Sequence, residues 1–163
     1  MMIGKERVTV VGKGAGADKR LYKIIEETSK YLPEGWRVEI YSGYRPGDQR
    51  FHGKKKAIDL ALFDPQGNRL ENYQEPKQFK TYEAFAKKVK EVQHKLYPAL
   101  DNLLAWGGYF SGTLGKTYGA MDLMHFDVGG ARGAAGSFEK GLSSSYVKKW
   151  GVKAPSALEM LKD

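Results

Sequence analysis

Two histidines in this sequence each lie near a carboxylate at a spacing that suits metal chemistry. His52 is followed by Asp59, which lies inside the apolar stretch Ala57–Phe63. A carboxylate among apolar side chains is costly to bury unless it is paired or bound to a metal ion. Asp122 similarly precedes His125 at the start of a second apolar stretch. The chain contains no cysteine, so histidines and carboxylates are the zinc ligands that the sequence offers.

If the two apolar stretches are neighbouring strands, His52, Asp59 and His125 can converge on one ion. Three N/O ligands with a fourth position left for water are typical of a catalytic zinc site. Asp122 would then lie beside the metal and accept a proton from the attacking water. The alternative is that both aspartates cap turns or pair with lysines. His94, between two polar residues, is expected at the solvated surface.

A further candidate is Arg45, in the segment Ser42-Gly43-Tyr44-Arg45-Pro46 that precedes His52. Its planar, permanently charged guanidinium could stabilise the oxyanion of a tetrahedral intermediate or hold a substrate carboxylate. The alternative is a surface arginine in a turn made by proline and glycine.

The elements that must position these residues can be predicted from periodicity. Alternating or continuous apolar patterns predict strands at 7–11, 36–41, 57–63 and 123–128. In the last of these, Leu123, His125 and Asp127 share one face. Helical periodicity predicts a helix capped by Asp18 that runs to about Tyr31, and another from about Thr81 to Pro98. Strands and helices mix without a regular βαβ rhythm, which favours an α+β fold.

Composition limits the possible partners. The 163 residues suit one domain, and the net charge of +8 favours a polyanionic partner such as an acidic cell wall, or else is only a soluble basic surface. The sequence contains no motif of alternating aromatic and basic residues of the kind that binds RNA, so a nucleic-acid partner is not expected. Apolar runs are too short for membrane insertion. The N-terminus does not resemble a signal peptide. If the protein acts outside the cytoplasm, we expect that something else delivers it there.

A glycine-rich segment after the first predicted strand, Gly12 to Gly16, superficially fits a dinucleotide-binding fingerprint. Such a fold would place an acidic residue at the end of the second strand and continue with further βαβ units. The second strand instead runs into Ser42–Arg45, so nucleotide binding is not expected.

These motifs together resemble the zinc D-alanyl-D-alanine carboxypeptidases and dipeptidases and the phage L-alanyl-D-glutamate endopeptidases. That family carries a Ser-Gly-Tyr-Arg segment, then His-x6-Asp, then an acidic residue three positions before a second His. The matching residues here are Ser42–Arg45, His52, Asp59, Asp122 and His125, with Trp106-Gly107-Gly108 upstream and Phe126 after the second His. The resemblance spans about Trp36 to Val128.

The chain departs from the family pattern at three positions. Arg50 replaces a frequent Ser and Lys55 a frequent Gly, which puts substrate fit in question more than metal binding. Asp122 replaces the Glu common in the carboxypeptidases, and this favours the phage endopeptidases, which can use Asp there.

The resemblance implies one domain over residues 1–163, with a central antiparallel sheet flanked by helices in the Hedgehog/DD-peptidase fold. It implies that His52, Asp59 and His125 bind zinc, that Asp122 activates water and that Arg45 stabilises the oxyanion. The expected substrate is a peptide bond of the peptidoglycan stem. The expected protein is a monomeric or virion-associated phage-type lysin, made in the cytoplasm and acting on the wall after release. The alternative is a non-catalytic zinc module that binds the wall or builds the virion.

Overall fold

The computed structural model describes residues 7–70, 76–109 and 123–130. Within these ranges the chain forms an α+β fold with a five-stranded mixed sheet in the order β1-β2-β3-β5-β4 and two α-helices. The elements are β1 (Val8–Lys13), α2 (Lys19–Ser29), β2 (Arg37–Ser42), β3 (Ala57–Phe63), α3 (Pro76–Leu96), η1 (Pro98–Leu100), β4 (Ala105–Trp106), η2 (Gly107–Tyr109) and β5 (His125–Asp127). The predicted α+β class is therefore confirmed.

The first two strands correct the expectation of an antiparallel sheet, because β1 pairs with β2 in parallel. Parallel neighbours need a crossover connection, and α2 supplies it. The predicted cap of this helix is confirmed: the Asp18 side chain accepts a hydrogen bond from the Arg20 backbone N–H at 2.9 Å. The apolar stripe of α2, which includes Leu21 and Ile24, is fully buried.

The central strand β3 has the predicted bounds and pairs antiparallel with β2 and with β5. Asp59 and His125 are direct cross-strand partners in this register. The strand β5 is shorter than the predicted 123–128. Just before β5, the carbonyl of Leu123 accepts a hydrogen bond from the Trp106 indole at 2.7 Å.

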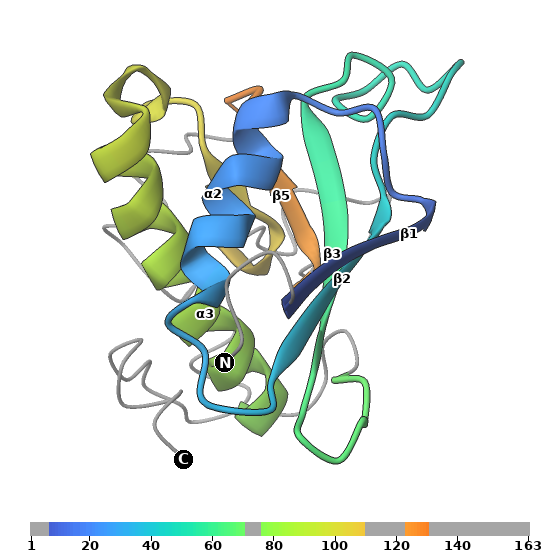
Figure 1. Ribbon diagram of the computed structural model, residues 1–163. Helices are drawn as coiled ribbons and strands as arrows, with labels where there is room; N and C mark the ends of the chain where they lie inside the picture. Colours follow the sequence, from blue (N-terminus) through green and yellow to red (C-terminus); the bar gives the residue numbers. More distant parts are fainter. Residues whose placement is uncertain (1–6, 71–75, 110–122, 131–163) are drawn as a thin grey trace.

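Both helices lie side by side on one side of the sheet (Figure 1). The longer helix, α3, begins at Pro76, earlier than the predicted Thr81, because proline is well suited to the first turn of a helix. Tyr82 donates a hydrogen bond from its hydroxyl to the Leu70 carbonyl at 2.7 Å and accepts one from the Leu62 amide. None of the helices in the described ranges is long and apolar enough to cross a bilayer.

The two faces of β3 and β5 have different roles. Phe126 packs edge-on against Phe85 of α3, with ring centroids 6.3 Å apart, and its cross-strand partner is Ile58. Successive side chains of a strand point to opposite faces. Asp59, His125 and Asp127 therefore lie on the face turned away from α3.

Candidate metal centre

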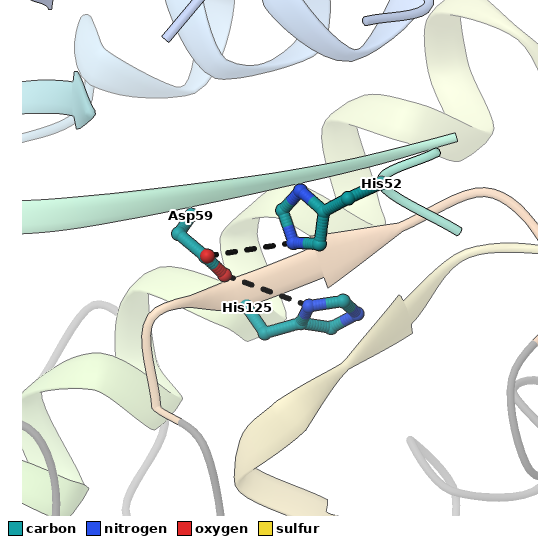
Figure 2. Close-up of side chains that lie close together, drawn as sticks. All are labelled: His52, Asp59 and His125. Carbon is teal, nitrogen blue, oxygen red and sulfur yellow. Dashed lines mark ion pairs between the residues drawn. The ribbon is translucent and has the colours of Figure 1, made fainter. Parts of the chain in front are cut away.

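Three of the predicted site residues meet at one point, from three separate segments. His52 comes from the loop between β2 and β3, Asp59 from β3 and His125 from β5. Each offers a ligand atom within 4.8 Å of the others. His52 Nε2 lies 3.4 Å from Asp59 Oδ2, and His125 Nδ1 lies 3.5 Å from Asp59 Oδ1 (Figure 2).

The second nitrogen of each imidazole is occupied by a hydrogen-bond partner. His52 Nδ1 lies 2.8 Å from the Gly43 carbonyl oxygen, and His125 Nε2 lies 2.7 Å from Asp127 Oδ2. Because a carbonyl oxygen can only accept, the proton of neutral His52 belongs on Nδ1. A carboxylate favours the same assignment for Nε2 of His125. When both rings are neutral, as metal ligands must be, the lone pairs of His52 Nε2 and His125 Nδ1 face Asp59, which is the arrangement found around metal-binding histidines.

Asp59 is buried, with 7% of its surface exposed. Burial alone would raise the pKa of its carboxyl, but the contacts with His125 and His52 outweigh burial and hold the pKa well below its usual range. The carboxylate is therefore anionic at neutral pH. Its Oδ1 atom has no hydrogen-bond partner among the described residues, and a buried anionic oxygen of this kind is suited to a cation.

Negative charge also surrounds His125. Burial alone would lower the pKa of this histidine, but Asp127 and Asp59 outweigh burial and raise the pKa to about 10. The ring thus lies between two carboxylates that favour positive charge at this point.

The donor set and its spacing fit zinc. Zinc takes His nitrogens and carboxylate oxygens at about 2.1 Å in tetrahedral sites, which puts neighbouring ligand atoms about 3.4 Å apart. Each histidine nitrogen lies at about this distance from one carboxylate oxygen of Asp59, His52 Nε2 at 3.4 Å from Oδ2 and His125 Nδ1 at 3.5 Å from Oδ1, and all three ligand atoms lie within 4.8 Å of one another. The His52 and His125 rings meet edge to face, with centroids 5.5 Å apart, so their nitrogens approach from different directions.

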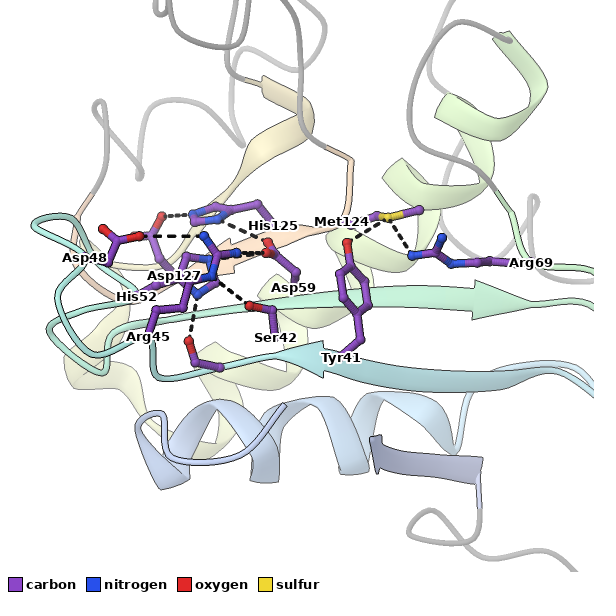
Figure 3. Close-up of polar contacts among 11 residues, drawn as sticks. Tyr41, Ser42, Arg45, Asp48, His52, Asp59, Arg69, Met124, His125 and Asp127 are labelled. Carbon is purple, nitrogen blue, oxygen red and sulfur yellow. Dashed lines mark hydrogen bonds and ion pairs between the residues drawn. The ribbon is translucent and has the colours of Figure 1, made fainter. Parts of the chain in front are cut away.

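The guanidinium of Arg45 lies against this group (Figure 3). Its Nη2 atom is 2.6 Å from Asp59 Oδ2, and its Nε atom donates to Ser42 Oγ at 2.9 Å. Its Nη1 atom lies 3.6 Å from Asp48 Oδ2. The side chain is still 43% exposed, so Arg45 contacts a candidate ligand and solvent at once.

The glycine-rich segment from Gly12 to Gly16, which begins in the last residues of β1, supports the loop that carries the site. The carbonyl oxygens of Lys13 and Ala15 accept hydrogen bonds from the backbone N–H groups of Gly43 and Tyr44, at 2.9 and 3.0 Å. A Cβ atom on Gly43 would lie 2.5 Å from the Gly14 carbonyl oxygen. This segment thus packs closely against Gly43, whose carbonyl orients His52.

The remaining predicted residues divide into three cases. Asp122, the predicted base, lies outside the described residues. His94 is exposed, as predicted, and its Nδ1 atom lies 2.9 Å from Asp101 Oδ2. Asp127 shares the face of His125, as the strand periodicity predicts, but the sequence motifs assign it no role. Its position two residues after a candidate ligand in a strand is the signal for one, because it puts both side chains on one face.

Comparison with protein-family models and with curated proteins gives no match for this chain. Inferences about its chemistry therefore depend on the sequence motifs and on the geometry of the site.

Proposed function

We propose that the protein is a zinc metallopeptidase that hydrolyses a peptide bond of the peptidoglycan stem, built on a Hedgehog/DD-peptidase-like fold. The observation that carries the proposal is the convergence of His52, Asp59 and His125 at ligand spacing, with the second nitrogen of each histidine already engaged. These residues would hold the ion. Zinc bound by them would supply Lewis acidity that activates water and polarises a carbonyl.

A catalytic role is favoured over a structural one by the number of ligands. Structural zinc sites use four protein ligands, whereas catalytic sites use three and leave one position open. In the described part of the chain, the candidate cluster contains three such residues. The half-exposed guanidinium of Arg45 beside them offers N–H donors to a substrate carbonyl or oxyanion.

Two further features of the chain support a peptidase acting on the wall. Asp122 precedes His125 at the position expected for the residue that accepts the proton of the attacking water. The net charge of +8 favours association with an acidic wall. The proposed protein is a phage-type lysin or virion-borne hydrolase. Its scissile bond is L-Ala–D-Glu or D-Ala–D-Ala.

The backbone at Lys55 also supports the proposed fold. Lys55 has φ of 62°, in the left-handed region that glycine adopts most readily. This is the position where the resembled enzymes often carry Gly. Lys55 therefore differs from those enzymes in residue type, but its backbone has the conformation that their glycine would favour.

Metal analysis tests the site itself. The purified protein should contain about one zinc ion per chain, because the described part of the chain holds one set of three N/O ligands. His52→Ala and His125→Ala should each lose the metal. His94→Ala is the matched control, since His94 is exposed and lies beside Asp101, and it should keep the metal. Full zinc retention in both ligand variants would refute the assignment.

Mass spectrometry of muropeptides tests the reaction. Digestion of purified peptidoglycan should give new fragments that identify the scissile bond, and a chelator should abolish them. Zinc binding without any new fragment would instead favour the non-catalytic wall-binding or virion module.

A further inference from the structure

We infer that Arg45 is a positioning residue for the metal ligand Asp59, which it restricts to a single ligand oxygen. In this arrangement Arg45 occupies Oδ2, and Oδ1 remains for the ion. The inference rests on the proposed metal site and goes beyond it, because it states that a neighbouring side chain determines how many oxygens of Asp59 bind the ion.

Three contacts fix the guanidinium. Nη2 lies 2.6 Å from Asp59 Oδ2, Nε donates to Ser42 Oγ at 2.9 Å, and Nη1 lies 3.6 Å from Asp48 Oδ2. Ser42 is itself the cross-strand partner of Asp59, so the sheet register sets the position of both contacts. A planar group held along its edge in this way has little freedom to leave the carboxylate.

The backbone of Arg45 is tied to a second candidate ligand. Its N–H donates to the carbonyl oxygen of His52 at 3.1 Å. Arg45 is therefore bonded to two of the three candidate ligand residues, through its main chain to His52 and through its side chain to Asp59.

The two oxygens of Asp59 are consequently different. Oδ2 accepts the hydrogen bond from Arg45 and lies 3.4 Å from His52 Nε2, whereas Oδ1 is buried without a hydrogen-bond partner in the described residues and lies 3.5 Å from His125 Nδ1. A carboxylate can bind a metal through one oxygen or through both. Binding through Oδ1 alone keeps the protein ligands at three atoms, while binding through both would fill the position that a catalytic site leaves open.

Coordination number is a better measure of this role than affinity. Removing Arg45 would loosen Asp59, which weakens binding, but would also remove a positive charge beside the ion, which strengthens binding. The two effects on affinity oppose each other, whereas a change from one ligand oxygen to two alters the coordination number in one direction.

Cobalt(II) in place of zinc provides the readout, since four-coordinate cobalt(II) absorbs visible light more strongly than five- or six-coordinate cobalt(II). With one cobalt ion bound per chain, wild type should give the intense absorption of a four-coordinate site. Arg45→Gln should lower the molar absorption at equal cobalt content. Lys54→Gln is the matched control, because it removes the same charge from an exposed residue of the same loop, and its spectrum should equal that of wild type.

An Arg45→Gln spectrum identical to that of wild type would overturn the inference. If this variant does not fold, Ser42→Ala removes only the Nε contact: a lowered absorption supports the inference and an unchanged one overturns it. Failure of the wild-type protein to bind cobalt or zinc would contradict the metal site itself. Failure to hydrolyse peptidoglycan would contradict only the peptidase, because the spectrum does not depend on turnover.

Discussion

His125 Nε2 lies 2.7 Å from Oδ2 of Asp127, two residues further along the same strand. Asp127 is fully buried, and its Oδ1 atom accepts a hydrogen bond from the Gly129 backbone N–H at 3.0 Å. The carboxylate is therefore held from one side while it orients the imidazole on the other. A partner of this kind sets which ring nitrogen faces a metal and how strongly it binds.

Asp127→Asn should lower zinc affinity about 10–100-fold, the usual loss when such a partner is changed. The amide can still accept a hydrogen bond from the imidazole, but because it is neutral the imidazole binds a metal ion more weakly. Competition with a chelator of known zinc affinity would measure the change.

Asp101→Asn is the matched control for this variant. It alters a second His–Asp pair, His94 and Asp101 at 2.9 Å, which lies outside the candidate site. Zinc affinity should stay at the wild-type value in this control. An unchanged affinity in Asp127→Asn as well would reduce Asp127 to a structural residue of the strand.

Asp122→Asn should keep zinc and lose hydrolysis about 10²–10⁴-fold, because an amide cannot accept the proton of the attacking water. Zinc content and the rate of muropeptide release, measured on the same preparation, separate the two properties. Unchanged turnover would show that another group is the base.

Gly43→Ala should weaken zinc binding through His52. The added methyl group would lie 2.5 Å from the carbonyl oxygens of Ala15 and Gly14, so the segment must move, and with it the carbonyl that orients His52. Overpacking of this kind costs about 1–3 kcal/mol of stability. We expect zinc affinity to fall as well.

Gly47→Ala provides the comparison. Gly47 lies in the same loop with φ of 87° and nothing within 4 Å of an added Cβ. Its backbone strain should cost about 1 kcal/mol and leave zinc affinity unchanged. Equal zinc affinities in the two variants would show that Gly43 does not position His52.

Low pH should remove the contribution of the Asp18 charge to the free energy of unfolding. The hydrogen bond from Arg20 is the largest of the effects that hold the pKa of Asp18 below its usual value. Because the folded state lowers the pKa of this carboxyl, its charge stabilises the folded protein at pH values above the unfolded pKa of about 3.9. This stabilisation is lost as the pH falls through the folded pKa. Asp18→Asn keeps the helix cap and removes the charge. Wild type should exceed this variant in unfolding free energy by less than about 1 kcal/mol at pH 7.

This difference should shrink towards zero as the pH falls from about 5 to about 2, measured by urea unfolding. Asp18→Ala also removes the cap and should be less stable than Asp18→Asn by about 1 kcal/mol at every pH. A difference between wild type and Asp18→Asn that does not change with pH would contradict the role of the charge.

Local patterns in the sequence were sufficient for the elements with strong periodicity. The strand Ala57–Phe63 has its predicted bounds, and the cap at Asp18 is where the sequence indicates it. Both depend on neighbouring residues, through apolar content and through the bond from a side chain to the first helical turn. The predicted start of α3 at Thr81 is later than the observed start at Pro76, because the residues before Thr81 have a weaker apolar pattern.

The sequence alone therefore determined the α+β class, the central strand and the residue types able to bind a metal. The tertiary structure decided which of them meet. Strand order and register bring Asp59 opposite His125, while hydrogen bonds made by the loop between β2 and β3 set the ring orientation of His52 and place Arg45 on Asp59. The pairing of Asp59 with His125 joins residues far apart in the chain, and neither periodicity nor local spacing encodes the direction of a side chain towards a strand that is distant in sequence.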